Sequence, residues 1–198
     1  MILASLKPYY YYLIGERKKT IEVRKSALKD LPQDIVFYMS KDEKSFAKIP
    51  KEFQEKYREH FGKVGMKVVC DKVDAYNFHE GLTEFNSMGL PSRIYGSYLI
   101  FADDYKSMCL SYDEVKSYGN RKIIYGWHIS DLKIYDRPKE LSEFKTPPCE
   151  KSENACGNCK WLVKINTPDV YECECYVEDG RPITRPPQSY MWVKELGE

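Results

Sequence analysis

The chain has 198 residues, of which 31 are Lys or Arg and 30 are Asp or Glu, and 42% of its residues are hydrophobic. This length and composition predict one folded domain with a small appendage, and they exclude a disordered tail. The net charge of +1 gives no overall attraction to nucleic acid or to an anionic membrane, so any such affinity needs a local patch. The sequence contains no apolar run of the roughly 20 residues that a membrane span needs, and no signal-peptide cleavage site follows its short apolar start. We therefore expect a cytoplasmic protein without a membrane partner.

The first predicted elements alternate between helix and strand. The four tyrosines at 9–12 fall on a helix, where their rings point all round, so we expect them mainly to cover the core, with base stacking as the alternative. Residues 20–24 read as a strand. Residues 49–62 read as a helix that starts at Pro50 and ends at Gly62, because Phe53, Tyr57 and Phe61 recur every fourth residue.

Later elements follow the same pattern. Residues 63–78 read as strands with an apolar set at Met66, Val68 and Cys70. A helix is predicted over 111–119, where Ser111 and Glu114 form a capping box. The strongest strand prediction covers 122–136, broken by Gly126 and closed by Arg137-Pro138. The unequal connections between these elements predict an α+β fold built on a small mixed β-barrel with flanking helices.

Cysteine distribution divides the chain in two. Five of the seven cysteines lie between Cys149 and Cys175, in a segment rich in Pro, Asn and short β-type pieces. We place the boundary near Thr146, which gives a domain over residues 1–145 and a Cys-rich extension with a C-terminal tail over residues 146–198.

The stretch KTIEVR, residues 19–24, contains the main candidate for a binding site. If it forms a strand, Ile21 and Val23 point into the core, while Thr20, Glu22 and Arg24 share the other face and Lys19 stands at its mouth. An exposed face with a weak Glu22–Arg24 pair is one interpretation. Residues 1–30, however, carry seven cations against three acids, so positive charge is concentrated at this end of a nearly neutral chain.

Three stretches of the sequence resemble ASCH domains, which belong to the PUA-like superfamily. They are LKPYYYYLIGERKKTIEVRKS at 6–26, YGWHISDLKIYDRPKELSEF at 125–144 and RPITRPPQSYMWVKEL at 181–196, and the last two resemble phage and bacterial members. The resemblance implies a compact β-barrel with a cleft that binds RNA or a modified nucleotide. It implies ligand-binding roles for Lys19, Thr20, Glu22 and Arg24. Arg24 would fork onto a phosphate or a base carbonyl, and Glu22 would accept from an exocyclic amine.

An enzymatic alternative also comes from the resemblance. One ASCH-like group hydrolyses the acetyl amide of N4-acetylcytidine with a lysine and a threonine of this strand and a glutamate elsewhere. Lys19 matches that lysine, and Glu22 stands where the threonine would be, so Lys19 and Glu22 are the catalytic candidates if the chain is a hydrolase. A lysine nucleophile needs a lowered pKa, which burial or neighbouring cations can provide.

Trp127 and His128 project to opposite faces of their predicted strand. A Trp beside a glycine is usually part of a core, so we expect Trp127 to be buried. His128 is more often a hydrogen-bonded structural residue, but it is also a secondary candidate for ligand binding.

The Cys-rich extension predicts a structural zinc site. Cys156-Gly-Asn-Cys159 has the spacing of a zinc knuckle, and Cys173 and Cys175 follow at a distance that can complete tetrahedral coordination. Cys149 is a fifth candidate, so four of the five would bind the metal. An iron–sulfur cluster or a redox dithiol would use the same residues. Cys70 and Cys109 are expected to be small buried apolar residues.

The same extension is acidic, with seven carboxylates against three lysines between Cys149 and Asp179. It would repel phosphates, so we expect a structural clip that lets the tail pack against the barrel. A third hypothesis is a protein-interaction adaptor that uses this acidic module.

Overall fold

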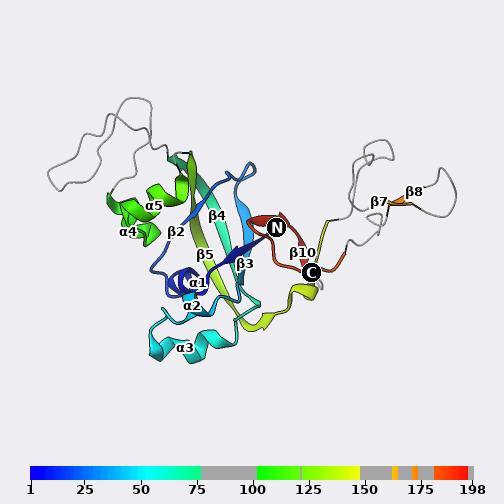
Figure 1. Cartoon of the computed structure of the whole chain (residues 1–198), viewed down its shortest axis with the longest axis horizontal. Coiled ribbons are helices and arrows are strands. Elements are labelled where there is room, and N and C mark those ends of the chain that lie inside the picture. Colours follow the sequence, from blue (N-terminus) through cyan, green and yellow to red (C-terminus); the bar gives the residue numbers. More distant parts are fainter. Residues whose placement is uncertain (77–101, 121, 148–161, 165–170, 174–180, 196–198) are drawn as a thin grey trace.

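The computed structural model describes residues 1–76, 102–120, 122–147, 162–164, 171–173 and 181–195 (Figure 1). Its centre is a six-stranded sheet in the order β2-β5-β4-β3-β1-β9. These strands are β1 Ile2–Leu6, β2 Ile21–Arg24, β3 Gln33–Met39, β4 Val64–Tyr76, β5 Ile124–Lys139 and β9 Tyr190–Trp192. Strands β1 and β3 are parallel, and the other neighbours are antiparallel, so the sheet is mixed.

The expected α+β class and mixed sheet are confirmed, but the sheet is an open, curled half-barrel. Strands β2 and β9 are its two edges. The long strands β4 and β5 shift register at three places along their pairing, and such bulges bend a sheet. Because the edge strands β2 and β9 do not pair with each other, main-chain hydrogen bonds between strands do not close the barrel within the described part of the chain.

The helices gather on one side of this sheet (Figure 1). They are α1 Pro8–Gly15, α2 Glu43–Phe46, α3 Lys51–Arg58, α4 Ala102–Met108 and α5 Tyr112–Gly119. The 3-10 turn η1 Leu141–Glu143 comes later, after β5, and packs with the third core cluster. The predicted capping box of α5 is present, with Ser111 and Glu114 bonded reciprocally. Helix α3 is shorter than predicted, because the chain turns after Arg58 and Phe61 forms an isolated bridge with Met39.

Strand β5 differs from its prediction. It continues through Gly126 and Pro138 to Lys139 instead of breaking at the glycine and closing before the proline. Gly126 is required by packing, since a Cβ there would lie 2.7 Å from Tyr76 Cε2 and 2.8 Å from Ile21 Cγ2. The glycine therefore leaves room for the side chains of Tyr76 and Ile21 to pack against β5.

Buried apolar side chains form a core on both sides of the sheet. The predicted set Met66, Val68 and Cys70 is fully buried in the largest cluster, together with Trp127. A second cluster joins Ile21 and Val23 of β2 to Met108 of α4 and Val115 of α5. This second cluster fixes the two last helices against the edge strand that carries the candidate site.

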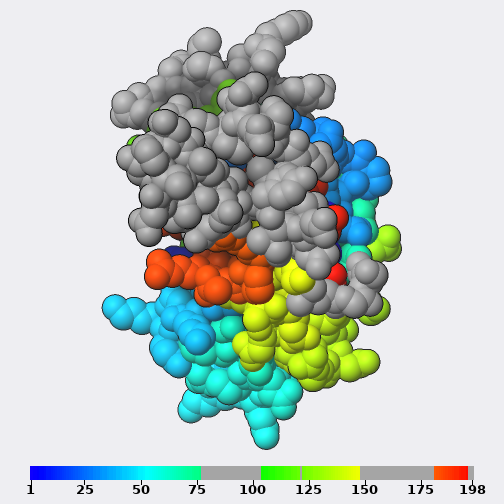
Figure 2. All heavy atoms as spheres, turned by 90° about the vertical axis from the view of Figure 1, so that its right-hand side faces the viewer, coloured from blue at the N-terminus to red at the C-terminus, as the bar shows by residue number. Residues whose placement is uncertain are grey.

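The tail, residues 181–195, belongs to the same structural unit. Strand β9 pairs with β1, and the short strands β6 Phe144–Lys145 and β10 Lys194–Glu195 pair with each other. Ile183 and Val193 are buried in the third cluster, with Phe144. Figure 2 shows the tail as an orange strip across the face that is turned toward the viewer. The tail thus packs back on the sheet, as its sequence position after the Cys-rich segment led us to expect.

Two short strands are described within the predicted Cys-rich extension. They are β7 Leu162–Lys164 and β8 Tyr171–Cys173, which pair with each other as an antiparallel ladder. Strand β7 consists of Leu-Val-Lys, in an apolar stretch of the extension.

Candidate ligand-binding cavity

Strand β2 is buried on both of its sides. Ile21 and Val23 pack into the second core cluster, and Glu22 and Arg24, on the other side, are only 7% and 6% exposed. The alternation predicted from KTIEVR is therefore present. The polar side faces the gap between the two edges of the half-barrel, which we call the seam: β2 lies on one side of it, and β1 and the residues leading into β9 lie on the other.

Three charged side chains meet at the seam. Lys19 Nζ lies 3.5 Å from Glu22 Oε2, and Arg24 Nε lies 3.1 Å from Glu22 Oε1. Lys19 is 2% exposed and also donates a 2.6 Å hydrogen bond to the main-chain oxygen of Met108. One carboxylate is thus held between two cations, in a site that is nearly closed to bulk water.

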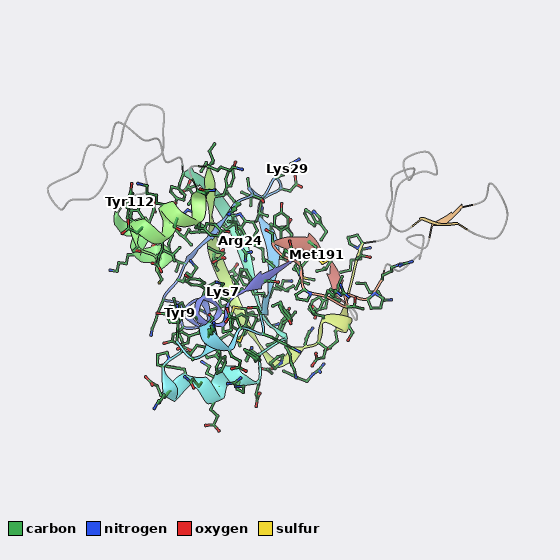
Figure 3. All side chains as sticks on the ribbon, viewed as in Figure 1. Lys7, Tyr9, Arg24, Lys29, Tyr112 and Met191 are labelled. Atoms are coloured by element: carbon green, nitrogen blue, oxygen red, sulfur yellow. The ribbon has the colours of Figure 1, made fainter. Side chains whose placement is uncertain are left out.

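Arg24 spans the seam. Its Nη2 donates to the main-chain oxygen of Ser5 in β1 at 2.8 Å, and its Nη1 donates to that of Ser189, just before β9, at 3.2 Å. The guanidinium carbon lies 5.5 Å from the ring centroid of Trp127, which packs edge-on against Tyr190. Figure 3 labels Arg24 near the middle of the view, and only 6% of this residue is exposed. A side chain therefore closes the half-barrel where strand pairing does not.

A cavity of about 740 Å³ opens beside these residues. This volume is within the usual range of roughly 300–1,000 Å³ for small-molecule sites. Its lining comes from β1, α1, β2, α5, the tail and residues just outside the ends of strands and helices. The lining residues are Ser5, Leu6, Lys7, Tyr10, Lys19, Glu22, Val23, Arg24, Ser40, Leu110, Asp113, Glu114, Ser117, Tyr118 and Gln188. We call it the seam cavity.

Charge in the seam cavity is balanced. The lining contains three cations, Lys7, Lys19 and Arg24, and three carboxylates, Glu22, Asp113 and Glu114. Burial lowers the pKa of Lys19, while the neighbouring Glu22 acts in the opposite direction. Burial raises the pKa of Tyr10, and the charges of Glu114 and Glu22 add to this rise. The lining therefore carries charged groups of both signs and has no excess of either.

The structure brings together some of the predicted site residues and separates others. Lys19, Glu22 and Arg24 line the seam cavity, whereas Thr20 is exposed and does not. His128 also lies outside the lining; its Nε2 is 2.7 Å from Asp74 Oδ2, and its side chain is 25% exposed. Trp127 is fully buried, as predicted.

Sequence reasoning missed the wall that α5 and the tail contribute. Asp113, Ser117 and Tyr118 of α5 and Gln188 of the tail line the cavity. The capping box identified α5 as a helix, but no signal in the sequence showed which of its polar residues would face β2. Tyr10 was anticipated only as one of four tyrosines with a possible stacking role.

The predicted metal ligands lie almost wholly outside the described residues. Cys149, Cys156, Cys159 and Cys175 are not described, and Cys173 is described only as the last residue of β8. Within the described ranges, no group of three or more His, Cys, Asp or Glu residues could hold a metal ion. Cys70 and Cys109 are free thiols; burial raises the pKa of Cys70 to about 11.

Comparisons with known proteins place the chain near one group of structures. Neither the protein-family models nor the curated proteins give a match. Among solved structures the chain is similar to ASCH from Zymomonas mobilis, with 15% identity and a TM-score of 0.46 over 98% of this chain and 87% of that one. Two point mutants of that protein are also similar. The first has a TM-score of 0.49 and 13% identity over 98% of this chain and 87% of that one. The second has a TM-score of 0.46 and 15% identity over 71% of this chain and 75% of that one. None of the described helices is long and apolar enough to cross a membrane.

Proposed function

We propose that the chain is an ASCH-type protein that binds RNA or a modified nucleotide, with a base held in the seam cavity. The observation that carries this proposal is the buried Lys19–Glu22–Arg24 cluster at the floor of a cavity large enough for a nucleoside. The residue pattern at 6–26, which resembles ASCH domains, supplies all three side chains. The resemblance and the geometry therefore point to the same strand.

Aromatic and basic residues around the cavity support a nucleotide ligand. Tyr10 and Tyr118 both line it, and bases of single-stranded RNA commonly stack on such rings. The Nζ atom of Lys25 lies 5.0 Å from the ring centroid of Tyr118, and Lys7 is exposed at the lining. A base inside the cavity would leave its sugar and phosphate near these two lysines.

The test is a fluorescence-anisotropy titration of labelled single-stranded RNA against the protein. We expect saturable binding that weakens with salt, because Lys7 and Lys25 would lie near the phosphate of a bound nucleotide. Tyr118→Ala should weaken binding by roughly tenfold, since loss of one stacked base is worth about 1–3 kcal/mol. Trp192→Ala is the matched control, because Trp192 is an exposed ring, 47% accessible, that does not line the cavity. Equal binding by the wild type and the Tyr118→Ala variant would exclude the seam cavity as the binding site.

A second candidate function is hydrolysis of an acylated base such as N4-acetylcytidine. It is favoured by Lys19, because burial lowers the pKa of its amine and so increases the fraction that is uncharged and nucleophilic. Incubation with N4-acetylcytidine, followed by mass spectrometry, should then show acetate release that is lost in Lys19→Arg. Unchanged N4-acetylcytidine after prolonged incubation with folded protein would remove this candidate.

We also propose that the Cys-rich extension holds one structural zinc ion through four of Cys149, Cys156, Cys159, Cys173 and Cys175. The spacing of the cysteines supports this assignment. Both of its ends connect to described structure, through β6 on one side and the tail on the other.

A further inference from the structure

The hydrogen-bonding pattern of the seam cavity restricts which base it accepts. Each oxygen of the Glu22 carboxylate contacts one cation, Lys19 on Oε2 and Arg24 on Oε1. A carboxylate has about four acceptor positions, two on each oxygen. Counting the contacts of the described residues, one position on each oxygen is left for a ligand.

The two cations are already bound to the protein. Lys19 Nζ donates to the Met108 oxygen, and the Arg24 guanidinium donates to the oxygens of Ser5 and Ser189. These bonds hold both cations in place beside Glu22. The floor of the cavity therefore offers a fixed acceptor pair, and a ligand that reaches it must supply donors.

Charge balance also bears on which part of a nucleotide enters. The three cations and three carboxylates of the lining give no net attraction for a phosphate, and Asp113 and Glu114 stand on the α5 wall. A neutral, planar group with hydrogen-bond donors suits this lining better than an anion does. A nucleobase meets this description.

Building on the proposed function, we propose that the seam cavity selects guanine, with the N1–H and the 2-amino group of the base donating in parallel to the two oxygens of Glu22. Guanine is the one standard base whose Watson–Crick edge has two adjacent donors. Adenine and cytosine place a ring-nitrogen acceptor next to their amino group, and uracil has one donor between two carbonyls. Each of these would set a lone pair against the carboxylate.

The proposal can be tested by changing the ligand, which does not depend on the folding of a variant. Isothermal titration calorimetry would compare guanosine with inosine, which lacks the 2-amino group, with 1-methylguanosine, which lacks N1–H, and with cytidine, adenosine and uridine. We expect guanosine to bind at least roughly tenfold more tightly than every other member of this panel, since a bidentate contact is worth about 1–3 kcal/mol of discrimination. A guanine-containing oligonucleotide and the free nucleoside would show whether the source of the base is RNA or a small molecule.

The protein-side test is Glu22→Gln, whose amide offers one acceptor and one donor. It should abolish the preference of guanosine over cytidine, while Glu55→Gln, an exposed glutamate of α3 outside the lining, should keep it. Circular dichroism would show whether both variants are folded. If Glu22→Gln does not fold, the comparison of nucleosides with the wild-type protein tests the guanine preference by itself. Equal binding of guanosine, inosine and cytidine would overturn the guanine selection and leave the proposed function standing. Binding of no nucleoside and no RNA would overturn both.

Discussion

Arg24 shows how one side chain can serve both the fold and the site. It is 6% exposed and reaches β1, the tail and Glu22. The sequence suggested a guanidinium that forks onto a phosphate. In the structure its donors hold main-chain oxygens across the seam, so its first role is to position Glu22 and the tail. Any effect of Arg24 on ligand binding would therefore include the geometry of the whole cavity.

Replacing Arg24 with methionine should destabilise the protein by about 2 kcal/mol or more, because the main-chain oxygens of Ser5 and Ser189 and the Glu22 carboxylate would lose a buried partner. Urea unfolding of the variant and the wild type measures this difference. Arg137→Met is the matched control: Arg137 is 74% exposed and pairs with Glu143, so its loss should cost under about 1 kcal/mol. Similar costs for the two variants would contradict the proposed closure of the seam.

Buried tyrosines should make the fold sensitive to alkali. Burial raises the pKa values of Tyr11, Tyr57, Tyr76 and Tyr105 above their usual range. In the unfolded chain these hydroxyls ionise near pH 10, so above this pH the unfolded state binds fewer protons and the free energy of unfolding falls as pH rises. The effect of Lys19 on the free energy of unfolding has the opposite sign. Because burial lowers its pKa, its contribution to the free energy of unfolding grows as pH rises to about 10.4, the pKa of an unperturbed lysine.

Urea titrations at about pH 8 and about pH 11 would measure the alkaline effect, with tyrosinate absorbance followed in parallel. The four tyrosines should outweigh the single lysine. The part of the tyrosinate absorbance that comes from these four buried rings should appear together with unfolding, while the more exposed tyrosines ionise in the folded protein. A free energy of unfolding that is the same at both pH values would contradict this expectation.

The sequence could group the residues of β2 but could not show how deeply they are buried. Period-two alternation correctly placed Glu22 and Arg24 on one side and Ile21 and Val23 on the other. Their burial depends on β1 and on residues near Ser189, which are remote in sequence. Thr20 was grouped with them by the same alternation, yet β2 begins only at Ile21, so Thr20 lies outside the strand and is exposed.

At the level of elements, Gly126 is the point at which three strands depend on one missing side chain. Gly126→Ala should destabilise the protein by about 1–3 kcal/mol, because its methyl group would press on Tyr76 of β4 and Ile21 of β2. Thermal and urea unfolding measure the cost. Lys133→Ala, an exposed position of the same strand, should stay within about 0.5 kcal/mol of the wild type. A Gly126→Ala variant as stable as the Lys133→Ala variant would show that β2 can shift away without cost.

Local signals predicted elements well where one pattern dominated. The apolar alternation at Met66, Val68 and Cys70 identified β4, and the Ser111–Glu114 capping box identified the start of α5. Breaker residues were less reliable, because β5 runs through Gly126 and Pro138. Whether a glycine or a proline ends a strand depends on its neighbours in the sheet, and a single sequence does not show them.

At the scale of the whole molecule, the proposed zinc ion would lie in the segment that connects β6 to the tail, and both of these belong to one folded unit. We expect about one zinc per chain in purified protein, measured by elemental analysis, and loss of that zinc in the Cys156→Ser, Cys159→Ser double variant. Cys109→Ser is the control, because Cys109 lies outside the proposed ligand set. If the analysis finds iron and the protein absorbs visible light, the site holds an iron–sulfur cluster and not zinc. Protein without bound metal would refute both assignments.

The overall class and the mixed sheet followed from the order of predicted elements, but the barrel did not close as expected. Strand order depends on pairings between segments far apart in sequence, such as β1 with β9. No local pattern encodes whether the last edge meets the first. The seam cavity is a consequence of this gap, so its existence could be predicted only from the resemblance and not from periodicity.

The pairing of β1 with β9 also sets an order of events during synthesis. Strand β1 lies between β3 and β9, so one of its edges is completed only by a strand made after every other strand of the sheet. At a translation rate of about 5–20 residues per second, β9 emerges roughly 10–40 s after β1. Until then the nascent chain presents an unpaired strand edge, the kind of surface to which chaperones and other copies of a chain attach. On a ribosome this protein would therefore spend most of its synthesis with the seam cavity lacking the wall that the tail contributes.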